Sequence, residues 1–454
     1  MPLSVVILAA GQGKRMHSDL PKVLQPLGGG TLLEHVLRTA TRLNPAAMYV
    51  VYGHGGEQVV NIFKQLPVQW VLQAEQLGTG HALMQALPQI PDEHDVLVLY
   101  GDVPMLRQKT LEALVASAQR GELAILTANL SNSTGYGRIL RDAAGEVRGV
   151  VEEKDATPEQ RRLKEASTGP LAAHAASLRG WLKNIGNDNA QKEYYLPDVI
   201  GLAVKDGTLV TAILAEIEEE VAGVNDRRQL AAAERALRRQ SAEALMQRGV
   251  TLRDPERIDL RGDLQCGRDV LIDINCIFEG RVRLGNHVRI GPNVLMRDCE
   301  LGDDTEVFAN CVLENAVVGA RARIGPFARI RPETLLADEV HIGNFVEVKQ
   351  SRLGRGTKAN HLAYLGDAEI GKQVNVGAGT ITCNYDGVNK HRTVIGDDAF
   401  IGSNSSLVAP VTVGAGATIG AGSVISKDAP AGELTLERAE QRTVKGWKRP
   451  KKQQ

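Results

Sequence analysis

Residues 318–348 read VGARARIGPFARIRPETLLADEVHIGNFVEV, with an aliphatic residue at every sixth position. The same spacing extends from Leu284 to Ile425, with an interruption between Val376 and Ile395. A period of six residues is typical of a parallel β-helix, in which three hexads complete one coil and each hexad buries one aliphatic side chain. The C-terminal part of the chain is therefore predicted to be a parallel β-helix of hexapeptide repeats.

The first half of the chain alternates short apolar runs with helical periodicity. The apolar runs are residues 4–10, 48–52, 95–100 and 124–130. Runs of this length are typical of parallel strands that are buried on both faces. Between the first two runs, residues 32–43 place their apolar side chains on one helical face. This order predicts an α/β fold, a Rossmann-like doubly wound domain.

A segment rich in Ala, Glu, Arg and Leu separates the two halves. It contains no Gly or Pro until Gly249, and this composition predicts one long connecting helix. The predicted organisation is a first domain over residues 1–227, a helical linker over 228–248, and the β-helix over 249–454.

Composition excludes several classes of function. The 454 residues include 53 basic and 54 acidic side chains, so the formal charge of −1 gives no field that would recruit nucleic acid or a membrane. The five cysteines form no Cys-x-x-Cys pair, which is typical of reduced thiols. No apolar run approaches the roughly 20 residues of a membrane helix, and the N-terminus does not resemble a signal peptide. We therefore expect a soluble, cytoplasmic protein.

The first strand runs into a glycine-rich turn, LAAGQGKRM at residues 8–16, and Lys22 follows. Glycines allow the main chain to approach a phosphate, and Arg15 and Lys22 can neutralise a triphosphate. A Gly-x-Gly turn alone is more often structural. The basic residues at these offsets favour a nucleotide site.

The strand at residues 95–100 ends in Tyr100-Gly101-Asp102. Doubly wound folds place their ligand-binding groups at this end of a strand, and a carboxylate there suits Mg²⁺, which prefers oxygen ligands. The alternative is that Asp102 caps the next helix. A second glycine-interrupted loop at residues 73–80 presents amides that can read the edge of a base.

The hexad register predicts which side chains of the β-helix point outward. His361 is third in the hexad headed by Ala359, so it does not belong to the core. Equivalent residues of successive coils stack about 4.8 Å apart, which places Asn344, His361 and Ala378 in one column. A lone histidine is more often structural, but an outward position argues against that reading here.

Two further columns are predicted to place charged and polar side chains near His361. Arg331 is predicted to stack on Lys349, and two adjacent cations of this kind indicate an anion site, such as a phosphate. Glu347 is predicted to stack beneath Tyr364. A solvated face is the alternative, but it would not require a histidine, a carboxylate, a tyrosine and two cations within one or two coils.

Ten motifs together carry a resemblance to a known family: LAAGQGKRM, PK, QAEQLGTGHA, YGDVP, TGYGRI, AQKEYY, GVN, HIGNFVE, YLGDAEIG and GAGTITCNYDG. The whole chain resembles the bacterial bifunctional N-acetylglucosamine-1-phosphate uridylyltransferase and glucosamine-1-phosphate N-acetyltransferase. The resemblance implies a left-handed β-helix and two activities. Acetyl-CoA would acetylate glucosamine-1-phosphate, and the product would then attack the α-phosphorus of UTP and expel pyrophosphate. These reactions lead to UDP-N-acetylglucosamine, which feeds peptidoglycan and lipopolysaccharide synthesis.

The resemblance also implies the residues of the first site. Those expected to hold the nucleotide and the UDP-sugar are Leu8, Ala9, Ala10, Gly11, Arg15, Lys22, Gln73, Gly78, Thr79, Tyr100, Gly101, Asp102, Gly137, Glu152 and Asn225. Asp102 and Asn225 are the implied Mg²⁺ ligands.

In the second site, the resemblance implies that His361 is the general base and that Glu347 orients it. The implied glucosamine-1-phosphate contacts are Arg331, Lys349, Tyr364 and Asn375. The implied acetyl-CoA contacts are Ala378, Asn384, Tyr385, Ser403, Ala421 and Arg438. The family forms homotrimers with acetyl sites at subunit boundaries, and the inserted loop at residues 382–394 is expected to project from the β-helix.

The sequence departs from the family pattern at a few positions. Ser167 replaces an asparagine that contacts the sugar, and Pro170 stands where an aliphatic strand residue is usual. Serine lacks the reach of the amide and proline removes a ladder donor, so sugar affinity is the property in question. Glu333 and Asn360 each replace a usual glycine, and Asn is the better tolerated of the two where φ is positive.

Two alternative functions remain open from the sequence. In one, the first domain is a single-activity pyrophosphorylase and the β-helix is structural or regulatory, but the His361, Glu347 and Tyr364 group argues against it. In the other, the protein is a trimeric scaffold that only senses nucleotides. Intact Lys22, Asp102 and Asn225 argue against a scaffold.

Overall fold

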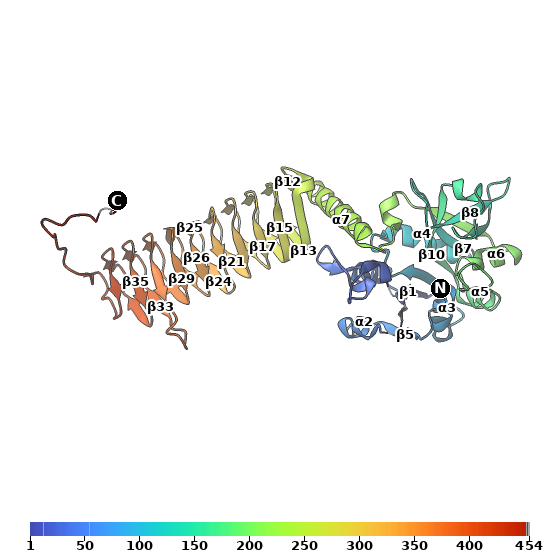
Figure 1. The fold of residues 1–454 in the computed structure, drawn as a ribbon, viewed down its shortest axis with the longest axis horizontal. Coiled ribbons are helices and arrows are strands. Elements are labelled where there is room, and N and C mark those ends of the chain that lie inside the picture. Colours follow the sequence, from blue (N-terminus) through green and yellow to red (C-terminus); the bar gives the residue numbers. More distant parts are fainter. Residues whose placement is uncertain (12, 54, 451, 453–454) are drawn as a thin grey trace. The chain divides into compact units, whose positions relative to one another are not determined.

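The computed structural model describes residues 1–454 except positions 12, 54, 451, 453 and 454. It contains two compact units, Met1–Leu237 and Arg238–Gln454 (Figure 1). In the described residues, no helix is both long and apolar enough to span a membrane. All five cysteines are free thiols.

The first unit is built on a nine-stranded sheet with the central order β11-β7-β10-β6-β1-β4-β5. Its strands are β1 (Leu3–Leu8), β4 (Ala47–Gly53), β5 (Gln69–Gln73), β6 (Asp95–Tyr100), β7 (Leu123–Asn129), β8 (Gly137–Arg141), β9 (Val147–Val151), β10 (Glu165–His174) and β11 (Val210–Leu214), with a separate pair β2 (Pro26–Leu27) and β3 (Gly30–Thr31). The neighbours of β1 are parallel to it, whereas β10 runs antiparallel to both β6 and β7. The predicted doubly wound sheet is confirmed, and the antiparallel strand is an addition to it.

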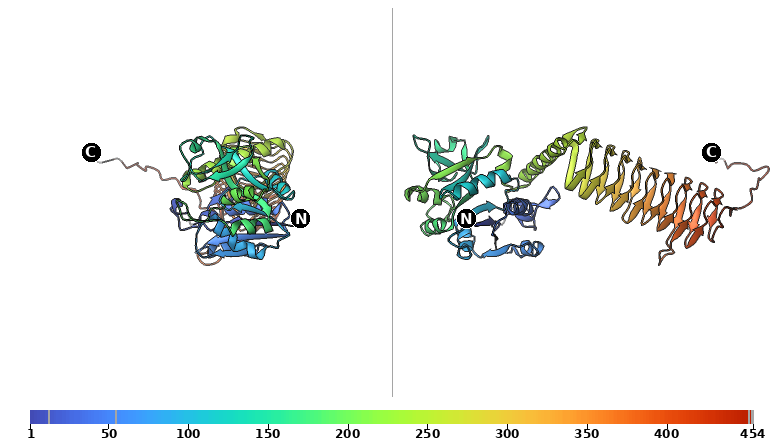
Figure 2. Two further views of the ribbon diagram at one scale, coloured as in Figure 1. Left: turned by 90° about the vertical axis from the view of Figure 1, so that its right-hand side faces the viewer. Right: turned by 180° about the vertical axis from the view of Figure 1, so that it is seen from behind.

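Helices cover both faces of this sheet, as the alternating apolar pattern predicts (Figure 2). They are α1 (Leu32–Thr41), α2 (Glu57–Ile62), α3 (Thr79–Ala86), α4 (Gln108–Ala118), α5 (Ala175–Leu182) and α6 (Asp198–Lys205), with short 3₁₀ turns that include η1 (Lys14–Met16) and η2 (Lys22–Leu24). One hydrophobic cluster joins α1 and α4 to one face, and a second joins α3, α5 and α6 to the other. Two separate cores therefore hold the sheet rigid between them.

The long helix α7 (Arg227–Gln247) follows the first sheet. Ala233, near its start, packs in a cluster with Met16, Leu27 and Leu32 of the first unit. Ala242 and Leu245, near its end, belong to the core of the second unit. The domain boundaries inferred from composition stay a prediction.

The second unit is a parallel β-helix, and the prediction from the six-residue period is confirmed. One face is formed by β12 (Thr251–Leu252), β14 (Leu271–Ile272), β16 (Arg289–Ile290), β19 (Glu306–Val307), β22 (Arg323–Ile324), β25 (His341–Asn344), β28 (Lys358–His361), β31 (Asn375–Val376), β34 (Phe400–Ile401), β37 (Thr418–Ile419) and β39 (Leu434–Thr435). The other two faces are formed by β13 (Ile258–Cys266), β15 (Cys276–Leu284), β17 (Leu295–Arg297), β18 (Glu300–Leu301), β20 (Val312–Glu314), β21 (Ala316–Val318), β23 (Arg329–Ile330), β24 (Thr334–Leu336), β26 (Glu347–Lys349), β27 (Arg352–Leu353), β29 (Tyr364–Gly366), β30 (Ala368–Ile370), β32 (Ile381–Cys383), β33 (Thr393–Ile395), β35 (Ser406–Val408), β36 (Val411–Val413) and β38 (Val424–Ile425).

The aliphatic residue of each hexad points inward. Ile324, Ile342 and Ala359 pair in successive coils, and each is at most 1% exposed. Each coil therefore buries its apolar side chains against the coils on either side of it, which fixes the register of the outward side chains.

The backbone conformation shows how the chain accommodates three residues that depart from the family pattern. Pro170 lies between Ser167 and Leu171, where the register of β10 against β7 shifts, so it displaces no regular ladder bond between these strands. Glu333 has a φ of 63°, in the left-handed region, whereas Asn360 is not among the residues with positive φ. The strained replacement of a usual glycine is therefore Glu333.

Candidate functional site

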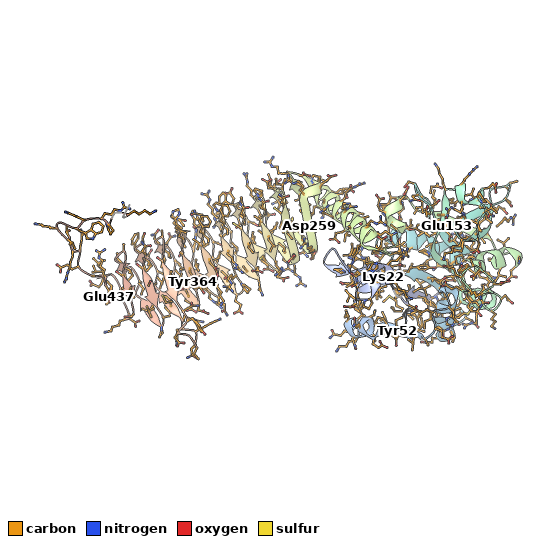
Figure 3. The ribbon with its side chains drawn as sticks, in the orientation of Figure 1. Lys22, Tyr52, Glu153, Asp259, Tyr364 and Glu437 are labelled. Atoms are coloured by element: carbon orange, nitrogen blue, oxygen red, sulfur yellow. The ribbon has the colours of Figure 1, made fainter. Side chains whose placement is uncertain are left out.

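A lysine, an aspartate and an asparagine meet at the carboxyl end of the central strands of the first unit. Lys22 Nζ donates to the carboxylate of Asp102 and, at 3.1 Å, to Oδ1 of Asn225. Lys22 begins η2, Asp102 follows β6, and Asn225 precedes α7. The Lys22 and Asp102 side chains are only 11% and 17% exposed, so the pair is well shielded from water. Figure 3 labels Lys22 in this unit.

The glycine turn lies beside this group because β1 and β6 are paired. Leu8 is opposite Tyr100, and the Gly101 N–H donates to the Leu8 carbonyl at 2.9 Å. Gly13 has a φ of 62°, and a Cβ there would lie 2.5 Å from Cβ of Lys22. The predicted segments Leu8–Gly11 and Tyr100–Asp102 are therefore brought together, with Lys22 packed against the turn.

The second glycine loop is held by a side chain of its own and by contacts with residues 194–196. Gln73 Nε2 donates to the Gly78 carbonyl at 3.1 Å. Thr79, the first residue of α3, accepts from the Leu196 N–H at 3.1 Å. Burial raises the pKa of Tyr100 above its ordinary value, which keeps the phenol protonated.

Three residues implied in sugar binding form one row across neighbouring strands. Gly137 on β8 is opposite Ser167 on β10. The β8–β9 register pairs Arg138 with Val151, so Gly137 and Glu152 are next in line. A Cβ on Gly137 would lie 3.4 Å from Oε1 of Glu152, which shows that the carboxylate covers this glycine.

Glu152 has an unusual electrostatic environment. Burial, followed by the nearby carboxylates of Asp198 and Asp155, raises its pKa above the ordinary value for glutamate. Glu152 and Asp155 also line a cavity of about 430 Å³ beside β9. The elevated pKa means that Glu152 holds its proton to a higher pH than an exposed glutamate, and a protonated carboxyl can donate a hydrogen bond.

One predicted residue of the first site makes no direct polar contact there. Arg15 lies in η1, is exposed, and makes no hydrogen bond or ion pair with the part of the chain that the structure describes. It is not brought into contact with Asp102 or Asn225.

In the second unit, the column predicted from the hexad register is confirmed. Asn344 on β25 pairs with His361 on β28 in the next coil. The two side chains form a hydrogen bond of 2.9 Å between Asn344 Oδ1 and His361 Nδ1. Among the described residues, Asn344 is the hydrogen-bond partner of His361, a position that the resemblance gives to Glu347.

Glu347 instead forms an ion pair with Arg331, with 2.8 Å between Oε1 and Nη1. The Lys390 ammonium beside Lys349, with a smaller contribution from Arg331, lowers the pKa of Lys349. Three cations thus surround one region of the β-helix surface, and an anion there would relieve their repulsion. Lys390 could not be predicted from the repeat, because it belongs to the inserted loop, whose path the hexad register does not determine.

Tyr364 and Asn384 lie on the same face as these cations. Glu347 is opposite Tyr364 in the coil above, as predicted. The Tyr364 hydroxyl lies over the Cα of Gly366, next to the Asn384 amide. The Asn384 amide donates to the Asp367 carboxylate. Figure 3 labels Tyr364 on this part of the β-helix.

The remaining predicted residues of the second unit differ in how close they lie to the His361 column. Asn375 on β31 pairs with Lys358, three residues before His361. Arg438 Nη1 donates to the Ala421 carbonyl at 3.0 Å, which brings these two together. Ala378, Ser403 and Ala421 follow His361 at equivalent positions of later coils, which continues its column. Tyr385 is 61% exposed in the loop and does not contact His361.

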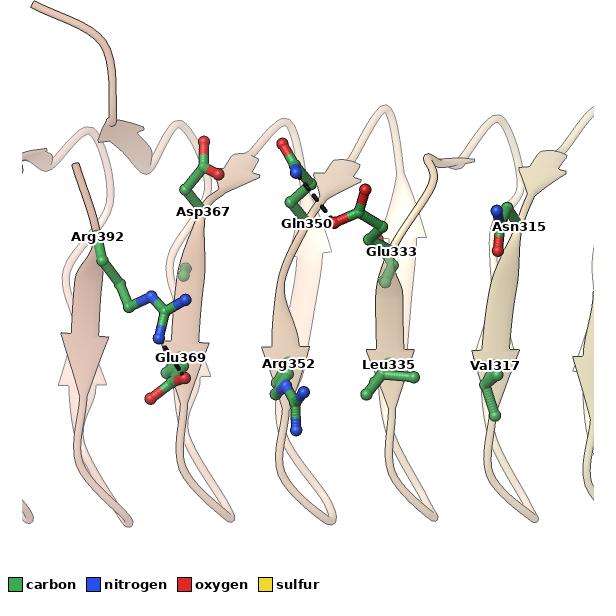
Figure 4. Close-up of a pocket in the computed structure, with 11 residues that line it drawn as sticks. Asn315, Val317, Glu333, Leu335, Gln350, Arg352, Asp367, Glu369 and Arg392 are labelled. Carbon is green, nitrogen blue, oxygen red and sulfur yellow. Dashed lines mark hydrogen bonds and ion pairs between the residues drawn. The ribbon is translucent and has the colours of Figure 1, made fainter. Parts of the chain in front are cut away.

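A separate groove of about 410 Å³ runs along the turns before β21, β24, β27 and β30 (Figure 4). Its polar side chains are largely paired with one another, as in Gln350 with Glu333 at 3.1 Å and Arg392 with Glu369 at 2.7 Å. None of the predicted site residues lines it.

Comparison with known proteins covers both units. Residues 5–195 match the model of MobA-like NTP transferase domains. Residues 260–358 match the GMPPB C-terminal domain, and residues 392–427 match six bacterial transferase hexapeptide repeats.

Similarity also extends over the whole length of the chain. It is 58% identical to the bifunctional protein GlmU of Methylococcus capsulatus over 453 residues, which covers 100% of this chain and 98% of that protein. It is 58% identical to GlmU of Alkalilimnicola ehrlichii, covering 99% and 96%, and 56% identical to GlmU of Stenotrophomonas maltophilia, covering 99% and 99%. The chain belongs to the GlmU family of bifunctional proteins.

Membership of the GlmU family decides between the hypotheses that the sequence left open. The chain is a bifunctional enzyme with nucleotidyltransferase and acetyltransferase activities, which act on small-molecule substrates. The GlmU nucleotidyltransferase uses a divalent metal. The hypotheses of a purely structural β-helix and of a nucleotide-sensing scaffold are not supported.

Proposed function

We propose that the two units carry out two consecutive reactions that make UDP-N-acetylglucosamine. The β-helix, over residues 249–454, acetylates glucosamine-1-phosphate with acetyl-CoA. The first domain, over residues 1–227, then transfers UMP from UTP to N-acetylglucosamine-1-phosphate and releases pyrophosphate, and the helix over 228–248 links them. The observation that carries this proposal is that each unit has its own convergent polar group, Lys22–Asp102–Asn225 in one and Asn344–His361 in the other.

In acetyl transfer, His361 is the proposed general base. Because an amide oxygen can only accept, the hydrogen bond from His361 Nδ1 to Asn344 Oδ1 places the ring proton on Nδ1 and leaves Nε2 as the acceptor. The sugar amine attacks the thioester carbonyl, a C–N bond forms, the C–S bond breaks, and the amine proton passes to Nε2. The coenzyme A thiolate then takes this proton from the imidazolium, which leaves as products the amide and the thiol and restores the neutral base.

The phosphate of glucosamine-1-phosphate is proposed to lie among Arg331, Lys349 and Lys390. An anion at this position would offset the repulsion that lowers the pKa of Lys349. The half-buried Ala378 and the exposed Ser403 and Ala421, with Arg438, are proposed to hold acetyl-CoA along the column that begins at His361.

In uridylyl transfer, the phosphate oxygen of N-acetylglucosamine-1-phosphate attacks the α-phosphorus of UTP, and the bond to the pyrophosphate oxygen breaks. Lys22 supplies positive charge to the triphosphate. The glycine turn at Leu8–Gly11 presents main-chain groups to it, and Gln73, Gly78 and Thr79 hold the base. The row of Gly137, Glu152 and Ser167 receives the sugar.

The metal proposed for this site is Mg²⁺. The oxygens of Asp102 and Asn225 already converge on one cation, the Lys22 ammonium, which shows that this position accepts positive charge. No group of three or more His, Cys, Asp or Glu side chains in the described residues could hold a metal, so substrate phosphates and water would complete the coordination. Bound Mg²⁺ would neutralise negative charge on the phosphates during transfer.

We also propose a cytoplasmic homotrimer without nucleic-acid or membrane partners. The rings of Phe327 and Phe345 stack at 5.3 Å and are 49% and 56% exposed. Leu362 is 63% exposed, and Val388 in the inserted loop is 82% exposed. These apolar side chains support an interface with further copies of the chain. Free cysteines support a reducing compartment.

The direct test is incubation with glucosamine-1-phosphate, acetyl-CoA, UTP and Mg²⁺, with the products identified by mass spectrometry. UDP-N-acetylglucosamine, coenzyme A and pyrophosphate are expected. Without acetyl-CoA, the sugar nucleotide should form only when N-acetylglucosamine-1-phosphate is supplied. Formation of UDP-glucosamine in its place would contradict the proposed order.

A further inference from the structure

Arg138 is a buried cation directly behind the row that receives the sugar. It is 2% exposed and follows Gly137 on β8. Successive residues of a strand point to opposite faces. The Arg138 side chain therefore leaves the strand on the face away from Gly137, Glu152 and Ser167.

The Arg138 guanidinium joins three separate segments on that face. Nη2 forms an ion pair of 2.8 Å with Glu153 Oε2, Nε donates to the Leu163 carbonyl at 3.1 Å, and Nη1 donates to the Tyr136 carbonyl. Arg161 strengthens the group by donating from Nε to the Glu153 carbonyl at 3.2 Å. One side chain thus fixes the entry to β8, the exit from β9 and the segment before β10.

Each anchored segment leads directly to a residue of the sugar row, which consists of Gly137, Glu152 and Ser167. Glu153 follows Glu152, and Arg138 follows Gly137. Arg138 is also opposite Ala166, the neighbour of Ser167. A rotation of Glu153 would move the Glu152 carboxylate, which covers Gly137. Because the two glutamates point to opposite faces, the ion pair on one face fixes the position of the free carboxyl on the other.

We infer that Arg138 is a positioning residue for sugar binding in uridylyl transfer, acting through Glu153 on Glu152. This inference rests on the proposed function, since it assumes that the row receives N-acetylglucosamine-1-phosphate. It assigns no contact between Arg138 and either substrate. The UTP groups, held by the ends of β1 and β6, do not depend on the ion pair.

The test is the steady-state kinetics of uridylyl transfer by the full chain with Arg138→Met, Arg138→Lys and Glu153→Gln. Hydrogen bonds to charged groups are the stronger ones, so Arg138→Met should raise KM for N-acetylglucosamine-1-phosphate by about tenfold or more, with KM for UTP unchanged. Glu153→Gln keeps the packing and removes only the charge, so it should move the same KM in the same direction by less. Arg138→Lys should recover part of the loss.

A matched control is available on the same strand. Arg141 forms an ion pair of 2.6 Å with Glu165 and is 36% exposed, away from the row. Arg141→Met removes an Arg–Glu pair that is more exposed than the Arg138–Glu153 pair, and it should leave both KM values unchanged. Thermal melting identifies any variant that is not folded. If Arg138→Met does not fold, the KM values of Glu153→Gln decide whether the ion pair positions the sugar site.

The outcomes separate the inference from the proposed function. If the unmodified enzyme does not use N-acetylglucosamine-1-phosphate with UTP, the proposed function is wrong and the inference is lost with it. If the enzyme does use it, and Glu153→Gln leaves its KM unchanged or raises the KM of UTP equally, the ion pair is merely structural and the inference is overturned.

Discussion

His361 Nδ1 lies 2.9 Å from Asn344 Oδ1, and the two residues occupy equivalent positions of consecutive coils. The backbone ladder that builds the β-helix therefore also sets the distance between a proposed base and its partner. Neither residue needs a loop to reach the other, because both belong to paired strands, β25 and β28.

Asn344→Ala should slow acetyl transfer by about two- to tenfold, the kinetic equivalent of one net hydrogen bond. The imidazole would remain but lose the group that holds its tautomer. The measurement is thiol release from acetyl-CoA with glucosamine-1-phosphate, compared with Glu347→Gln. If Glu347→Gln is impaired and Asn344→Ala is not, the orienting partner is Glu347, and the contact seen here does not operate in catalysis.

Asp102→Ala should abolish uridylyl transfer and leave acetyl transfer nearly intact. The substitution removes one of the two protein oxygens proposed to hold Mg²⁺ and releases Lys22 from its ion pair. Both activities should be assayed on one preparation. If a folded variant lost both activities in parallel, the two sites would not be independent, and the proposal would be contradicted.

Ser167→Asn should tighten N-acetylglucosamine-1-phosphate binding. Ser167 lies opposite Gly137 in the sugar row, so a longer amide there would extend toward the substrate. One added hydrogen bond of about 0.5–1.5 kcal/mol corresponds to about a two- to tenfold fall in KM. An unchanged or higher KM would mean that the serine is already compensated.

Asp95→Asn should stabilise the first unit at high pH. The Asp95 carboxylate is fully buried, neither oxygen has a hydrogen-bond partner among the described residues, and burial raises its pKa above 3.8. Between 3.8 and the raised value, the folded state binds more protons than the unfolded state, so this group's contribution to stability falls as pH rises.

Calorimetry should therefore show a higher Tm for Asp95→Asn than for the wild type at about pH 8, and a smaller difference at about pH 4.5. A constant difference at both pH values would show that Asp95 does not change its protonation on unfolding.

The repeat was the most predictable part of the molecule. The period of six requires one inward residue per hexad, and from this alone the pairs Asn344–His361 and Glu347–Tyr364 follow correctly. In the first domain, the strand at residues 95–100 was predicted with the bounds that the structure has. Local apolar runs and glycines identify such strands because each is buried on both faces.

What the sequence could not predict depends on long-range geometry. The convergence of Lys22 on Asn225 joins residues 203 positions apart, and its geometry cannot be obtained from local patterns. Lys390 reaches Lys349 through a loop that has no repeat. The ion pair of Glu347 with Arg331, rather than a contact with His361, depends on side-chain directions within the register.

The proposed base and the independence of the two sites are tested most directly by assaying both activities of His361→Ala. Acetyl transfer should fall by about 10²- to 10⁴-fold, the usual contribution of general acid–base catalysis. Uridylyl transfer on supplied N-acetylglucosamine-1-phosphate should equal that of the wild type, because the substitution lies in the other unit. A folded His361→Ala enzyme that retains near wild-type acetyl transfer would contradict the assignment of the base and, with it, the site proposed on the β-helix.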